Sequence, residues 1–117
     1  MNREQLVQQL MATFLDELNV HVSSLGRDLL ALENDITAEK RSQAWASIFR
    51  AAHSLKGASA VVHVEPIHIA CHRLEDIFEY YRSSGQSLSQ EMTSTLLKAV
   101  DAIEELGIRI RAEQEFE

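Results

Sequence analysis

The chain has 117 residues, 45% of them hydrophobic and 25% charged, and this composition is typical of one folded domain with its own hydrophobic core. Its formal net charge of −7 argues against a nucleic-acid-binding protein, because such proteins need a basic face, and against docking on an anionic membrane. One proline and four glycines are too few for the frequent turns of a strand-rich fold. We therefore predict an all-α protein.

Neither a membrane span nor an oxidising compartment is indicated. No apolar run approaches the roughly 20 residues that cross a bilayer, and no signal-peptide pattern precedes the first polar stretch. The single cysteine, Cys71, cannot form an internal disulfide. These features predict a cytoplasmic domain.

Hydrophobic residues at steps of three and four predict four helices, over roughly residues 2–33, 38–63, 66–83 and 88–111. The first would be about 45 Å long at about 1.5 Å per residue, longer than a small bundle needs, so we expect its N-terminal turns to protrude or bend. Its inward stripe is predicted to contain Leu6, Leu10, Phe14, Leu18, Val22, Leu25, Leu29 and Leu32.

Capping residues separate the later helices. Thr37 is a predicted N-cap of the second helix, and Pro66 fits the first turn of the third. Gly85 ends the third helix, Ser87 or Ser89 starts the fourth, and residues 112–117 form a polar tail that we expect to fray. The inward stripe of the third helix is predicted to contain Ile67, Ala70, Cys71, Leu74, Ile77, Phe78 and Tyr81. Together these elements predict an antiparallel up-down-up-down four-helix bundle in one domain, residues 1–117.

His53 lies outside the apolar stripe of the second helix, roughly 130° from its centre, with Lys56 and Gly57 one turn further along. An imidazole is largely neutral near pH 7 and can then act as a nucleophile. The Lys56 ammonium could stabilise the oxygens of a phosphoryl group on His53. Gly57 would clear space for a bulky group or another protein's backbone, since a mid-helix glycine otherwise only costs about 1 kcal/mol. An exposed nucleophile on a convex helix suits a carrier, because donor and acceptor must both reach it.

The third helix carries a polar flank beside its apolar stripe, formed by His68, His72, Glu75 and Glu79. In an antiparallel bundle this flank can face the His53 edge of the second helix. A carboxylate that accepts the proton of one imidazole nitrogen fixes the tautomer and leaves the other nitrogen free to attack. Glu75 is the candidate for this role.

At this point the residues resemble a known family. The run from Ile48 to Gly57 (IFRAAHSLKG), followed by His72-Arg73-Leu74-Glu75, is similar to the signature of the histidine phosphotransfer (HPt) domain. Within that family it most resembles the N-terminal phosphotransfer domains of chemotaxis histidine kinases of the CheA type. The likeness covers roughly Phe14 to Leu106.

The resemblance implies a helical bundle that is phosphorylated at the solvent-facing nitrogen of His53, with a supporting network from Lys56, His72 and Glu75. In the family the phosphoryl group comes from a separate ATP-binding kinase domain and goes to an aspartate of a response-regulator receiver domain. This chain has no glycine-rich nucleotide loop, so we expect it neither to bind ATP nor to phosphorylate itself. We expect a monomeric carrier without a cofactor, either free or, as we favour, one domain of a larger signalling kinase.

The chain departs from the family pattern at two points. Ala58 stands where a second glycine is common, and Val62-His63-Val64 replaces a connection that usually contains glycine. Two other interpretations stay open. His63, His68 and His72 could bind a metal, although no cysteine pattern completes such a site. Alternatively, a helix face could bind a partner without any chemistry.

Overall fold

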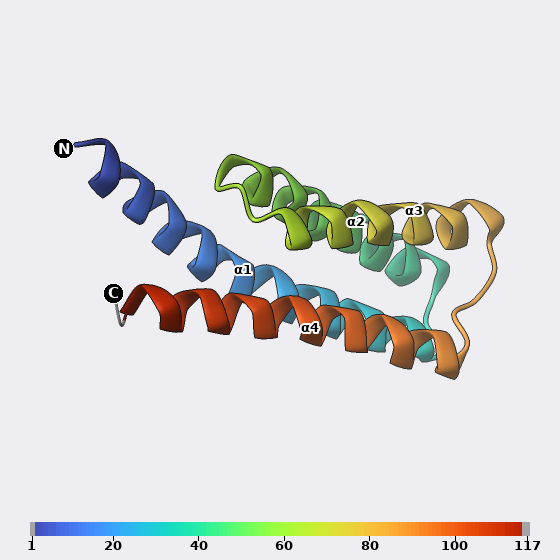
Figure 1. The fold of residues 1–117 in the computed structure, drawn as a ribbon. Helices are drawn as coiled ribbons and strands as arrows, with labels where there is room; N and C mark the ends of the chain where they lie inside the picture. Colours follow the sequence, from blue (N-terminus) through green and yellow to red (C-terminus); the bar gives the residue numbers. More distant parts are fainter. Residues whose placement is uncertain (1, 116–117) are drawn as a thin grey trace.

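The computed structural model describes residues 2–115, and four α-helices make up nearly all of this range. They are α1 (Arg3–Glu33), α2 (Ala38–Val61), α3 (Glu65–Ser84) and α4 (Gln90–Glu115). Figure 1 shows them running in alternating directions, with α2 and α3 on one side of the molecule and α1 and α4 on the other. α2 packs on both α1 and α3, whereas α4 packs mainly on α1 and touches α3 only over a short stretch. The predicted antiparallel four-helix bundle is confirmed.

The core is built where the apolar stripes of the four helices meet. Phe78 is fully buried in it, and the rings of Trp45 and Phe49 pack against it with centroids 6.1 and 6.3 Å away. These contacts fasten α3 to α2. On the other side of the bundle, Gly107 allows α4 to approach α1 closely, since an added Cβ would lie 3.0 Å from Cδ2 of Leu18. The interior therefore fixes how each helix is rotated about its axis.

The helix ends confirm the predicted caps. Thr37 Oγ1 accepts a hydrogen bond of 3.2 Å from the Lys40 backbone N–H at the start of α2. Gly85 ends α3 in the left-handed conformation, with φ of 70°. At the start of α4, Ser89 Oγ accepts from the Met92 backbone N–H at 3.0 Å, which selects Ser89 over the alternative start.

The turn from α2 to α3 is closed by a residue in an unusual conformation. His63 has φ of 60°, a value at which glycine is normally found. Its backbone N–H donates to the Ala60 carbonyl at 3.2 Å, and the Val64 N–H donates to the Ser59 carbonyl at 2.9 Å. This is the hydrogen-bond pattern of a Schellman motif. It ends α2 at Val61, earlier than the predicted limit of residue 63.

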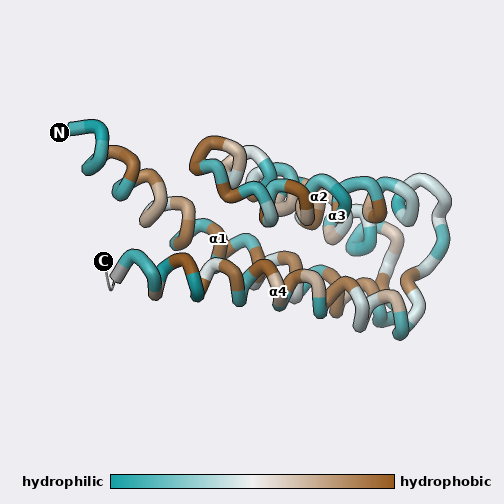
Figure 2. The backbone as a smooth tube through the Cα atoms, in the orientation of Figure 1, coloured by the Kyte–Doolittle hydropathy of each residue, from teal (hydrophilic) through white to brown (hydrophobic). Residues whose placement is uncertain are grey.

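Two parts of the predicted apolar stripes are wrong. Leu6 and Leu10 are 48% and 43% exposed, because the N-terminal turns of α1 project past the ends of α2 and α3 and diverge from α4, as Figure 1 shows and as the length of α1 led us to expect. Figure 2 accordingly places hydrophobic segments on this projecting part. Ile77 is 36% exposed, because it lies on the flank of α3 opposite Glu75 and α4 gives that side little cover. None of the helices described in residues 2–115 has an apolar stretch of membrane-spanning length.

Residues 112–117 were predicted to fray, and for residues 112–115 this prediction is wrong, because α4 continues to Glu115. Residues 116–117 lie outside the described range. Near this end of α4, Arg111 Nη2 lies 2.7 Å from Asp16 Oδ1. The ion pair joins the last turns of α4 to α1 and gives them a partner that the sequence pattern did not reveal.

Candidate functional site

His53 projects from the middle of α2 into solvent. Its neighbours Ala52 and Leu55 are fully buried and set the rotation of the helix, so that the His53 side chain is left 76% exposed. Gly57, one turn further along, is also exposed, and a Cβ added there would meet no atom within 4 Å. No neighbour within the described chain therefore requires a glycine at this position.

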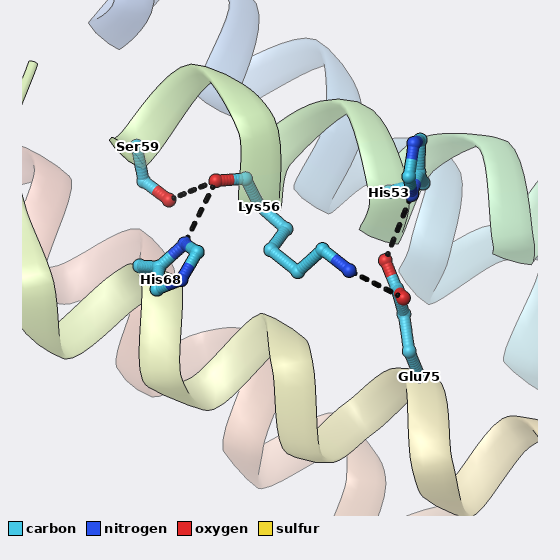
Figure 3. Close-up of polar contacts among 5 residues, drawn as sticks. All are labelled: His53, Lys56, Ser59, His68 and Glu75. Carbon is cyan, nitrogen blue, oxygen red and sulfur yellow. Dashed lines mark hydrogen bonds and ion pairs between the residues drawn. The ribbon is translucent and has the colours of Figure 1, made fainter. Parts of the chain in front are cut away.

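Glu75 reaches from α3 across to both His53 and Lys56 (Figure 3). Its Oε2 accepts a hydrogen bond of 2.9 Å from Lys56 Nζ, and its Oε1 lies 3.4 Å from His53 Nδ1. The side chains of Glu75 and Lys56 are only 18% and 21% exposed, so this ion pair is shielded behind the imidazole.

The contact between His53 and Glu75 is long for a hydrogen bond. Glu75 Oε1 is buried and has no hydrogen-bond donor among the described residues. A carboxylate oxygen in this position favours a proton on the nitrogen that faces it, which is Nδ1. With the proton on Nδ1, the lone pair of the neutral imidazole lies on Nε2, the other ring nitrogen.

A second contact between α3 and α2 was missed by sequence reasoning. His68 Nδ1 lies 3.1 Å from the Lys56 carbonyl oxygen, which also accepts a hydrogen bond of 2.8 Å from Ser59 Oγ (Figure 3). Because a carbonyl only accepts, Nδ1 of His68 carries the proton. The contact holds α2 at the residue that supplies the site lysine. The available signal was the spacing of His68 and Glu75, which are two helical turns apart on one face of α3.

The structure thus brings together His53, Lys56 and Glu75, and leaves Gly57 beside them. His72 is exposed, and in residues 2–115 it takes part in no side-chain hydrogen bond or ion pair, so its supporting role stays a prediction. Within the same range no three histidine, cysteine or acidic side chains lie close enough to hold a metal ion.

Cys71 lies on the core side of α3 and is fully buried. Burial is the main reason why the pKa of its thiol rises from 9.0 to about 12, and the nearby Glu75 carboxylate adds to the rise while Lys56 opposes it. A thiol of this kind is protonated near neutral pH and inert as a nucleophile. The imidazole of His53 therefore remains the candidate nucleophile of the site.

The sequence is similar to known phosphotransfer domains. A family model described as Hpt domain matches residues 9–106. The chemotaxis protein CheA of Borreliella burgdorferi is 32% identical over 104 residues, which cover 88% of this chain and 12% of that protein. CheA of Bacillus subtilis is 32% identical over 98 residues, which cover 84% of this chain and 14% of that protein. The chain therefore spans only a small part of the length of these relatives.

Solved structures give the same likeness. The CheA phosphotransferase domain from Thermotoga maritima matches with a TM-score of 0.76 and 25% identity, over 87% of this chain and 94% of that one. The phosphorylated P1 domain of CheA3 in complex with CheY6 from R. sphaeroides matches with a TM-score of 0.77 and 24% identity, over 91% of this chain and 80% of that one. The second match concerns the fold alone.

Proposed function

Because this chain belongs to the Hpt domain family, we propose that it is the phosphoryl carrier of a two-component signalling system, with His53 as the acceptor. The observation that carries the proposal is one exposed imidazole whose Nδ1 faces a shielded carboxylate. This arrangement directs the nucleophilic nitrogen outward, where both a donor and a recipient can reach it.

In the first half-reaction, the Nε2 lone pair of His53 attacks the γ-phosphorus of ATP held by a kinase domain. The N–P bond forms, the bond from phosphorus to the bridging oxygen breaks, and ADP leaves with that electron pair. Phosphorylated imidazole with a proton on Nδ1 is cationic. Glu75, whose Oε1 lies 3.4 Å from Nδ1, stabilises this charge and fixes the tautomer beforehand.

In the second half-reaction, an aspartate carboxylate of a receiver domain attacks the same phosphorus. The N–P bond breaks, its electron pair returns to Nε2, and an acyl phosphate forms on the partner. The recipient is proposed by analogy with a domain of the same fold, the phosphorylated P1 domain of CheA3, whose structure was solved in complex with CheY6. The donor is proposed to be the ATP-binding domain of a CheA-type kinase, since the chain covers only 12–14% of two such relatives.

The other site residues support this chemistry. Lys56, which donates to Glu75 Oε2 at 2.9 Å, orients the carboxylate and lies close enough to His53 for its charge to favour phosphoryl oxygens. The open space at Gly57 admits the partner's backbone. His72, exposed on the same flank of α3 as Glu75, is proposed to contact the phosphoryl group or the partner once they are bound. The domain is proposed to work as a cytoplasmic monomer, without its own ATP site, in chemotaxis-type signalling.

Incubation with a CheA-type kinase domain and radiolabelled ATP tests the proposal. We expect an acid-labile, alkali-stable label that disappears in His53→Gln, while circular dichroism stays helical. Ser54→Ala is the matched control, because Ser54 is the exposed neighbour of His53 on α2, and it should be labelled normally. A label that persists in His53→Gln would refute the assignment. A partner that responds equally to the unlabelled variant would favour a docking module without chemistry.

A further inference from the structure

A cleft of about 480 Å³ opens between the start of α2 and the end of α3, away from the residues of the phosphoryl site. Trp45 and Tyr81 form part of its apolar wall, and Arg41 and Arg82 are the charged residues that line it. Ala38, the first residue of α2, also lines it, so the positive end of that helix dipole faces the cleft. None of the lining residues is acidic.

Within residues 2–115 the two arginines have no anionic partner of their own. Among residues 2–115 the ion pairs of arginine involve Arg27, Arg109 and Arg111, and neither Arg41 nor Arg82 forms one. The Arg82 guanidinium is nevertheless held in place, because its Cζ lies 5.0 Å from the centroid of the Phe49 ring. Stacking leaves the in-plane N–H groups free to donate.

This concentration of positive charge is local. The chain has a net charge of −7, yet the charged residues that line the cleft, Arg41 and Arg82, are both basic. An apolar wall beside two free guanidinium groups fits a carboxylate-bearing segment that also has apolar side chains.

We propose that the cleft formed by Arg41, Trp45, Tyr81 and Arg82 docks an acidic, partly apolar peptide segment of the receiver domain that takes the phosphoryl group from His53. The proposal rests on the proposed carrier function for the identity of the partner. Trp45 and His53 are eight residues apart on one helix, about 12 Å at about 1.5 Å per residue. A partner seated at His53 can therefore reach the cleft along α2 and α3.

Trp45 is the single tryptophan of the chain and lines the cleft, so its fluorescence reports occupancy directly. The probe is a blocked hexapeptide of alternating glutamate and leucine, with glutamine replacing glutamate in the control peptide. We expect the acidic peptide to cause a saturable change in Trp45 emission, and the same change in His53→Gln. Added salt should weaken this binding. Arg41→Gln/Arg82→Gln should weaken binding about 10- to 100-fold. The control Arg3→Gln/Arg109→Gln removes the same charge elsewhere and should leave peptide binding unchanged.

No emission change with the acidic peptide, or equal binding by the glutamine peptide or by Arg41→Gln/Arg82→Gln, would overturn the proposal. Inorganic phosphate that binds as tightly as the peptide would overturn it in favour of a small-anion site. None of these readings requires phosphorylation of His53, so they stand apart from a failure of the carrier function.

A transfer assay then links the cleft to the partner. With receiver domain in excess over the labelled chain, Arg41→Gln/Arg82→Gln should raise the half-saturating receiver concentration about tenfold and leave the maximal rate within twofold. An unchanged half-saturating concentration, or a lower maximal rate alone, would contradict docking by these arginines.

Discussion

Replacing Gly57 by alanine should make the domain more stable and a poorer carrier. Gly57 is an exposed residue inside α2, and an added Cβ would meet no atom within 4 Å. Only the helix propensity then changes, which favours alanine by about 1 kcal/mol. In a domain of this size such a gain raises Tm by about 4 °C. The methyl group would, however, stand where a partner must approach His53.

Thermal and urea unfolding measure the first effect, and single-turnover transfer to a receiver domain measures the second. A displacement of about 1 Å between reacting groups can cost about 100-fold in rate, so we expect a loss of about 10- to 100-fold. Gly26→Ala is the matched control. Gly26 also lies inside a helix, and a Cβ added there would likewise meet no atom within 4 Å. Because Gly26 is on α1, its replacement should add stability without slowing transfer.

Two results would refute this reasoning. Destabilisation by Gly57→Ala would mean that the helix at this point is not free to accept a methyl group. Transfer at the original rate, together with the stability gain, would mean that no partner comes close to Gly57. In that case another reason for the glycine would be required.

Three further changes test other parts of the structure. Glu75→Gln removes the charge behind the imidazole and should slow phosphorylation about 10- to 100-fold in a single-turnover assay. A phosphorylation rate within twofold of that of the original chain would exclude a role for the Glu75 charge. His63→Gly removes the strain of a left-handed backbone at φ of 60° and should raise the unfolding free energy, measured in urea, by about 1 kcal/mol. The stability of His63→Asn should lie between those of the original chain and His63→Gly. A loss of stability in His63→Gly would show that the histidine ring itself is needed. The raised pKa of Cys71 stabilises the fold fully below pH 9, and this contribution is lost towards pH 12 as the unfolded thiol ionises. Above pH 9 the unfolding free energy of the original chain should therefore fall more steeply than that of Cys71→Ala, by about 1.4 kcal/mol per pH unit. Parallel curves for the two proteins would contradict this prediction.

The sequence predicts the bundle well because its signal is long and periodic. Apolar residues recur at helical spacing through each of four segments, and a stripe of that kind must be buried against other stripes. The same period predicts that His53 faces outward, since the angle between a residue and the stripe depends only on the helix geometry. Glu75 could be placed on the correct flank for the same reason.

Periodicity does not predict how far a neighbouring helix extends. Leu6 and Leu10 continue the stripe of α1, yet they are exposed because that helix extends past α2 and α3 and diverges from α4. Nor does it predict contacts that depend on the separation of two helices and on a side-chain rotamer. The hydrogen bond from His68 to the Lys56 carbonyl is of this type, and so is the meeting of Arg41 and Arg82 at one cleft.

A carrier nucleophile must be open to two different proteins and still have a defined protonation pattern, and these requirements conflict on a single side chain. The structure divides them between two residues. His53 is 76% exposed and keeps access, whereas Glu75 is 18% exposed and holds the carboxylate in a fixed place behind it. Lys56 and the core of α3 fix Glu75 independently of any partner, so we expect Nε2 to face outward in both of the proposed half-reactions. In the proposed mechanism, donor and recipient act on the same nitrogen, and the direction of transfer is then determined by the partners and not by a rearrangement of the carrier.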